Sequence, residues 1–105
     1  MKRSKRFAPI QRIASMRENQ AAKTWGEARR TEAAAREQLQ ALAQYLNEYR
    51  ENYHRARQRG MGAGQMIEYQ RFIAKLEAAI REQQETVGQC EDNSRRQQTQ
   101  WEQRH

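Results

Sequence analysis

The segment Gly60-Met61-Gly62-Ala63-Gly64 decides the fold, because it is the only cluster of helix-breaking residues in this 105-residue chain. Glycine costs roughly 1 kcal/mol against alanine inside a helix, so three glycines in five positions predict a turn. An uninterrupted helical pattern runs on both sides of the segment. We therefore expect an all-α protein with two long helices, over about residues 9–58 and 65–105, joined by a turn near residues 59–65.

The composition favours long helices over a compact globule. Leu, Ile, Val and Phe provide only 12 of the 105 residues, well below the roughly 20% that a packed globule needs. Ala, Glu, Lys, Leu and Arg provide 51 residues and Gln another 15, a share typical of coiled coils and long helices. With one Val and four Thr, the chain lacks the residues that β-architecture requires.

The apolar residues alternate in steps of three and four, which is the 3.5-residue repeat of a left-handed coiled coil. We call these positions the seam. In the first helix the seam consists of Ala21, Trp25, Ala28, Glu32, Ala35, Leu39, Leu42, Leu46, Tyr49, Tyr53 and Ala56. In the second helix it consists of Met66, Tyr69, Ile73, Leu76, Ile80, Gln83, Val87, Cys90, Ser94, Gln97 and Trp101.

One antiparallel register fits both seams. Pairing residues whose numbers sum to 122 sets Tyr53 against Tyr69 at one end and Ala21 against Trp101 at the other, always joining an a position to a d position. The sequence therefore predicts an antiparallel coiled-coil hairpin. Ile10 and Ile13 find no partner in this register, so we expect the natural chain to continue beyond His105.

The positive charge is unevenly distributed. The formal net charge is +7, and residues 1–36 carry all of it, because residues 37–105 contain ten basic and ten acidic side chains. Residues 1–8 are interpreted as a basic N-terminal tail. The tail is either a solubilising segment, a binding site for an acidic protein or, as the weakest alternative, a site for nucleic acid.

Enzymatic chemistry finds no support in the sequence. Neither His54 nor His105 has a partner at i+3 or i+4 that resembles a metal motif, and Cys90 is isolated and interpreted as a small seam residue facing Glu32. The sequence predicts no cofactor, no metal site and no catalytic residue. No apolar run approaches the roughly 18 residues that span a bilayer, and no signal-peptide core follows the basic start, so we expect a cytoplasmic protein.

Within the predicted hairpin, residues 9–105, two aromatic residues lie outside the seam. Tyr45 and Phe72 occupy g positions, which flank each other along one edge of an antiparallel pair, where charged residues are usual. Either the rings broaden and shield the seam, or they form a binding patch, since aromatic residues are enriched in binding hot spots.

Two segments around these rings carry a family resemblance. Gln38-Leu39-x-x-Leu42-x-x-Tyr45-x-Asn47-Glu48-Tyr49-Arg50 and Tyr69-Gln70-x-Phe72-Ile73-x-x-Leu76-Glu77-x-Ala79-Ile80, with a glycine-containing turn between them, resemble the FliJ family of the flagellar type III export apparatus. The match covers roughly residues 25–85. The resemblance implies a stalk-like coiled coil that couples the export ATPase ring to the export gate and assists with substrate–chaperone complexes.

The resemblance also implies partners and sites. The partners would be a hexameric FliI-like ATPase, a FlhA-like gate protein and substrate chaperones, with the protein held at the inner-membrane export apparatus only through them. The gate-binding residues would be Gln38, Leu42, Tyr45, Tyr49, Phe72, Leu76 and Ala79. The ATPase-binding residues would be Lys2, Arg3, Lys5, Arg6 and Arg12. The alternatives are an injectisome stalk protein and, in another class, a basic coiled coil that binds nucleic acid.

Overall fold

The computed structural model describes the backbone of residues 2–104 and the side chains of residues 9–104. It contains two helices, α1 (Lys2–Arg59) and α2 (Ala63–Arg104), and within residues 2–104 only the three residues between these helices are not helical. The prediction of an all-α chain built from two long helices is confirmed. The helix α1 begins seven residues before Pro9, so this proline lies inside the helix, where its ring removes one backbone donor without ending α1.

The turn is made by the glycine segment. Gly60 adopts a φ of 95°, a left-handed conformation that glycine takes without a steric penalty. Its N–H donates to the carbonyl of Arg57 at 3.2 Å, and the N–H of Met66 donates to the carbonyl of Gly62 at 3.1 Å in the first turn of α2. Gly60 therefore ends α1 as a left-handed C-terminal cap, and the chain reverses within a few residues.

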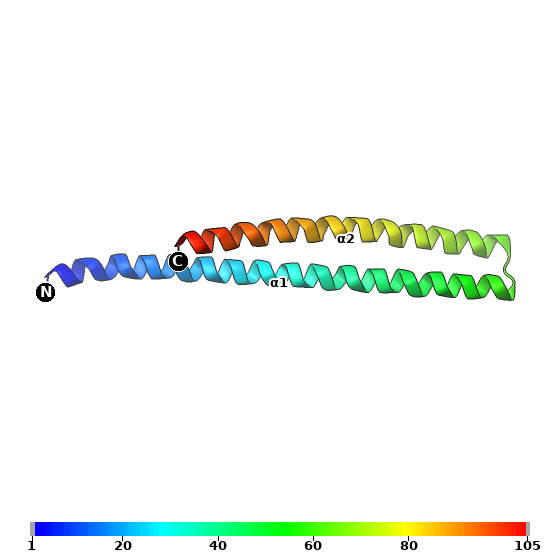
Figure 1. Ribbon diagram of the computed structural model, residues 1–105, viewed down its shortest axis with the longest axis horizontal. Helices are drawn as coiled ribbons and strands as arrows, with labels where there is room; N and C mark the ends of the chain where they lie inside the picture. Colours follow the sequence, from blue (N-terminus) through cyan, green and yellow to red (C-terminus); the bar gives the residue numbers. More distant parts are fainter. Residues whose placement is uncertain (1, 105) are drawn as a thin grey trace. The chain divides into compact units, whose positions relative to one another are not determined.

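The chain divides into two compact units. One, which we call the turn unit, is Ala34–Gly88 and contains the turn. The other, the terminal unit, combines Met1–Ala33 with Gln89–His105. Within the turn unit, the end of α1 and the start of α2 lie side by side in opposite directions (Figure 1). Within the terminal unit, α1 and α2 contribute one segment each.

The residues predicted to form the seam are the ones that the two helices bury between them. All 22 seam residues that the sequence predicts are buried or half-buried. The most buried apolar side chains are all seam members: Ala28, Ala35, Leu46, Leu76 and Val87. Ser94, also on the seam, is the buried polar residue. The 3.5-residue repeat therefore identifies which face of each helix packs.

One ring contact across the helices in each unit can be compared with the predicted register, and the turn unit shows the predicted pair. In the turn unit, the rings of Tyr53 and Tyr69 stack with centroids 5.2 Å apart, as the sum of 122 predicts. In the terminal unit, the rings of Trp25 and Trp101 lie 5.0 Å apart, although the register pairs Trp25 with Gln97. Because an indole is long, it reaches a neighbour one helical turn beyond its formal partner.

Candidate protein-binding surface

Three aromatic rings meet on the turn unit. Phe72 of α2 lies 4.5 Å from the ring centroid of Tyr49 and 6.0 Å from that of Tyr45, the second contact being edge-to-face at 79°. Tyr45 and Tyr49 share one face of α1 because they are four residues apart. Tyr45 is 47% exposed, whereas Tyr49 and Phe72 are half-buried. We call these three residues the aromatic edge.

The aromatic edge continues towards the turn as a row of rings. The ring of Tyr69 lies 5.1 Å from that of Tyr49 and stacks on that of Tyr53 at an interplanar angle of 19°. The amide of Gln70 donates to the Tyr53 hydroxyl at 3.1 Å. Offset and edge-to-face rings at such distances attract each other beyond their burial. Because Tyr49 contacts both Tyr45 and Tyr69, the row supports the exposed ring of Tyr45.

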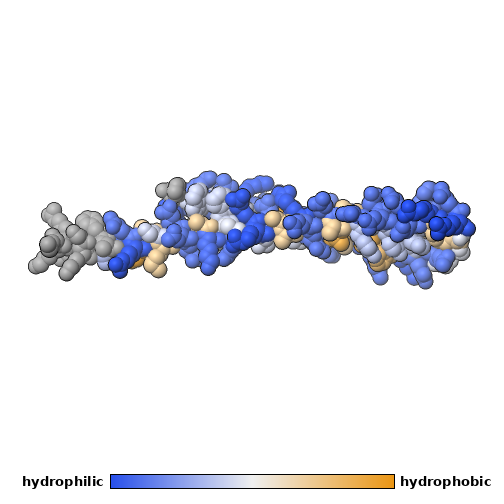
Figure 2. Space-filling view, turned by 90° about the horizontal axis from the view of Figure 1, so that it is seen from below, coloured by the Kyte–Doolittle hydropathy of each residue, from blue (hydrophilic) through white to orange (hydrophobic). Residues whose placement is uncertain are grey.

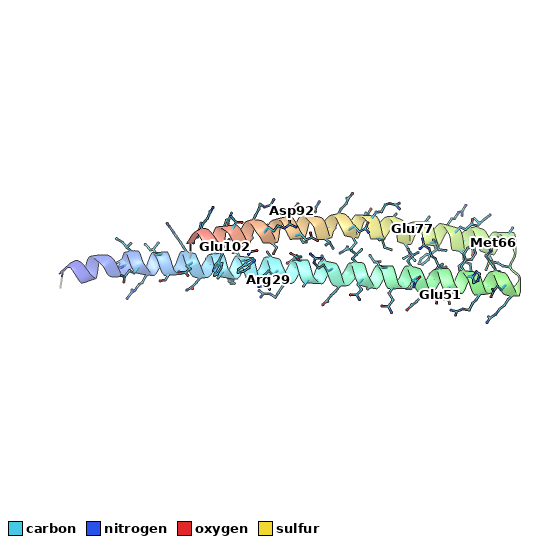
Figure 3. The ribbon with its side chains drawn as sticks, in the orientation of Figure 1. Arg29, Glu51, Met66, Glu77, Asp92 and Glu102 are labelled. Carbon is cyan, nitrogen blue, oxygen red and sulfur yellow. The ribbon has the colours of Figure 1, made fainter. Side chains whose placement is uncertain are left out.

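The aromatic edge carries no charge of its own. Partial burial raises the pKa of Tyr49 above its ordinary value of 10.0, and Tyr69, Tyr45 and Glu68 raise it further. Tyr49 is therefore a neutral phenol at physiological pH. Beside the edge, a guanidinium nitrogen of Arg50 lies 3.2 Å from a carboxylate oxygen of Glu77 on the other helix. Figure 3 shows where Glu77 lies on α2, further from the turn than Met66.

The seven predicted gate-binding residues differ in how much surface they expose. Tyr45, Tyr49 and Phe72 are in mutual contact, and Gln38 is exposed. Leu42 and Ala79 are half-buried. Leu76 is only 8% exposed, so it supports the seam and offers little surface to a partner.

The predicted ATPase-binding residues are described only in part. The side chains of Lys2, Arg3, Lys5 and Arg6 lie outside the described side chains, whereas the backbone of residues 2–8, most of the tail assigned to residues 1–8, belongs to α1. Arg12 is described, and it is exposed on α1. This prediction therefore stays a prediction.

Two side-chain contacts that the sequence did not predict occur in the two units: one joins α2 to α1 in the turn unit, and the other lies within α1 in the terminal unit. The side-chain amide of Gln83 donates to the carbonyl of Ala35 at 3.0 Å. The guanidinium of Arg29 lies 5.3 Å from the ring centroid of Trp25. The sequence spacing could have predicted the contact of Arg29 with Trp25, because residues four apart share a helix face. The hydrogen bond from Gln83 to Ala35 depends on how the two helices pack.

The described residues show no group suited to a metal ion or a membrane span. Among residues 9–104, no three His, Cys, Asp or Glu side chains lie close enough together to hold a metal. In the same part of the chain, neither helix has a stretch that is long and apolar enough to cross a membrane. Cys90 is half-buried on the seam of the terminal unit, where it lines a shallow groove with Thr24 and Ala28.

Known proteins resemble this chain over most of its length. Residues 3–105 match the family described as FliJ, flagellar FliJ protein. The flagellar FliJ protein of Escherichia coli (strain K12) is 36% identical over 83 residues, which is 79% of this chain and 56% of that protein. The flagellar FliJ protein of Salmonella typhi is 41% identical over 68 residues, which is 65% of this chain and 46% of that protein. The chain thus spans about half the length of these curated relatives.

Proposed function

Because the chain belongs to the flagellar FliJ protein family, we propose that it works in the flagellar protein export apparatus by binding other proteins and not by catalysis. The observation that carries this proposal is the aromatic edge. Tyr45 exposes nearly half of its surface, and Phe72 and Tyr49 hold its ring in one orientation. A rigid, partly exposed aromatic side chain with a polar hydroxyl is typical of a binding hot spot.

The finer proposal is that of a stalk. The basic N-terminal arm, Lys2, Arg3, Lys5, Arg6 and Arg12, would contact a hexameric export ATPase, and the aromatic edge would contact the export gate protein. Substrate chaperones are further partners in this proposal. The protein would be cytoplasmic and would reach the membrane export apparatus through these partners. A coiled coil suits this role because its seam keeps the spacing of surface residues fixed while its faces remain available for binding.

The gate interaction is tested by removing two rings. Tyr45→Ala combined with Phe72→Ala should weaken binding to the purified gate protein about thirtyfold or more, since a single hot-spot residue already contributes roughly 2 kcal/mol. The measurement is a dissociation constant from calorimetry. Far-UV circular dichroism should show unchanged helicity.

Two further variants keep this test decisive. Glu51→Ala with Arg81→Ala changes two exposed residues on the same two helices and should leave gate binding unchanged. Tyr45→Ser alone changes the most exposed ring of the aromatic edge, so it should weaken binding without disturbing the seam. If the gate protein binds both Tyr45 variants as tightly as the unaltered chain, the aromatic edge is not the binding surface.

The ATPase interaction is tested through charge. Replacing Lys2, Arg3, Lys5 and Arg6 by Gln should weaken association with the purified ATPase, and the difference should shrink as salt rises because exposed charges are screened. Gate binding should be unaffected by the same change. Salt-independent ATPase binding by both chains would contradict the electrostatic role of the arm.

A further inference from the structure

The turn end of the turn unit is positively charged and has no carboxylates of its own. From Asn52 to Ile67 the sequence contains no Asp or Glu, but it contains Arg55, Arg57 and Arg59. All three arginines are exposed. The balance of charges over residues 37–105 hides this cluster, because the matching acidic residues lie elsewhere along the helices.

The three arginines are not neutralised by neighbours. Arg55 donates to the side-chain oxygen of Asn52 at 2.8 Å, and the guanidinium of Arg57 lies 5.5 Å from the ring centroid of Tyr53. Within the described part of the chain, none of the three forms an ion pair with a carboxylate. By contrast, Arg50 pairs with Glu77. The arginines near the turn therefore keep most of their donors available for an external anion.

Apolar side chains accompany these charges. Ile67 is 48% exposed, and Met61 and Met66 are half-buried. Hydrophilic side chains dominate the face of the molecule in Figure 2, and apolar ones appear there as short separate patches. The end of α1 thus carries three exposed arginines, and the start of α2, across the turn, carries an exposed isoleucine.

The glycines leave the backbone of the turn uncovered by side chains. Only Gly60 has a positive φ, so only this glycine is required by the backbone conformation. At Gly62 and Gly64 an added Cβ would meet no atom within 4 Å, so no internal packing requires glycine there either. Without side chains at these positions, the backbone of the turn can approach an external surface closely.

We propose that the turn end, comprising Arg55, Arg57, Arg59, Met61 and Ile67 and here called the basic tip, binds the surface of an anionic lipid bilayer. Phosphate headgroups attract clustered arginines without requiring a matching geometry. Ile67 and Met61 would enter the interface while the arginines extend towards the headgroups. Exposed arginines and an exposed isoleucine near the same turn fit a lipid surface better than nucleic acid, which offers phosphates but no apolar layer beneath them.

This inference is independent of the proposed export function. It depends only on the charge, exposure and apolar character of the basic tip, and the aromatic edge has no part in it. The test needs neither the ATPase nor the gate protein. Failure of the vesicle experiment would therefore leave the gate and ATPase experiments unaffected, and the converse also holds.

The experiment is co-sedimentation with lipid vesicles. The full chain carrying Lys2→Gln, Arg3→Gln, Lys5→Gln and Arg6→Gln is used, so that the N-terminal charges do not contribute. The vesicles contain phosphatidylcholine alone or with about 30 mol% phosphatidylglycerol, at about 50 and 500 mM NaCl. We expect binding to the anionic vesicles only, and weaker binding at the higher salt concentration.

Variants within this background locate the binding surface. Arg55→Gln, Arg57→Gln and Arg59→Gln together should lower the partition coefficient about a hundredfold, since each cationic side chain near an anionic membrane contributes about fivefold. Ile67→Ser should lower it by a smaller factor. The matched control, Lys75→Gln with Arg81→Gln and Arg96→Gln, removes three exposed charges away from the turn and should bind nearly as well as the background chain.

Three results would overturn the proposal. The first is equal vesicle binding by the tip variant and its matched control. The second is equal binding to neutral and anionic vesicles. The third is a titration in which the same chain binds duplex DNA or polyglutamate more tightly than anionic vesicles at equal salt, which would identify the basic tip as a site for a different class of polyanion.

Discussion

The turn unit and the terminal unit use the same seam but bury different side chains in it. The turn unit buries Leu46 and Leu76 and adds a row of aromatic rings between its two helical segments. The terminal unit buries Ala28 and Ser94, and its ring contact is the Trp25–Trp101 pair. A heptad position therefore determines whether a residue is buried, whereas the size of the side chain determines how much burial contributes.

This difference should appear as a difference in local stability. A fully buried Leu or Phe contributes roughly 1.5–3 kcal/mol, and an alanine, with fewer carbons, contributes much less. The turn unit also contains the turn, so its contacts close a short loop at a low entropic cost. We expect the turn unit to be the more stable part and the terminal unit to open first.

The largest expected effect is loss of a leucine from the turn unit. Leu76→Ala should lower the free energy of unfolding by about 2–4 kcal/mol, because it leaves a space in a packed seam. Urea denaturation followed by circular dichroism measures this loss. Ile67→Ala, on the same helix but half exposed, is the control and should cost much less. Equal losses would show that the seam does not hold the turn unit together.

The next effect concerns the terminal unit. Trp101→Ala removes one ring of the indole pair and should speed amide hydrogen exchange in residues 9–33 and 89–104 while leaving residues 34–88 nearly unchanged. In the unaltered chain, the terminal-unit amides should already exchange about tenfold faster or more. Trp101→Phe keeps a ring and should have a weaker effect. Uniform exchange rates across both units would remove the distinction between them.

A smaller effect tests a polar contact across the turn unit. Gln83→Ala removes the donor to the Ala35 carbonyl and should cost about 1 kcal/mol, the usual net contribution of one hydrogen bond. Thermal or urea unfolding measures the loss. Gln84→Ala, at an exposed neighbouring position, should change stability little. If both variants lose equally, helix propensity and not the cross-helix bond explains the result.

The smallest effect is a pH dependence confined to the turn unit. The pKa of Tyr49 is raised in the folded chain, so the unfolded chain loses this proton first as pH rises. The associated stability is fully present below the ordinary pKa of 10.0 and is lost as pH rises through the folded value. Tyr49→Phe should therefore make alkaline unfolding, followed by circular dichroism, less steep, and unchanged steepness would contradict this expectation.

The fold was largely predictable from the sequence, and the site was predictable only in part. Gly60 and its neighbours identified the turn, and among residues 9–104 the 3.5-residue repeat identified every fully buried position. Tyr45 and Phe72 were expected on one edge, and the structure brings their rings to 6.0 Å. Leu76, however, stands in the same predicted gate-binding set although it is buried, because a sequence motif does not separate residues that support a surface from those that form it.

The sequence by itself determined that the chain forms two helices, where it turns and which face of each helix packs, because helix propensity and heptad spacing are local properties of the chain. Only the tertiary structure decided that Gln83 reaches the Ala35 carbonyl and that Trp25 meets Trp101. It also showed that the arginines near the turn lack carboxylate partners within the described part of the chain. These features depend on which other residues a side chain reaches in the folded chain. The heptad repeat along one helix does not contain this information.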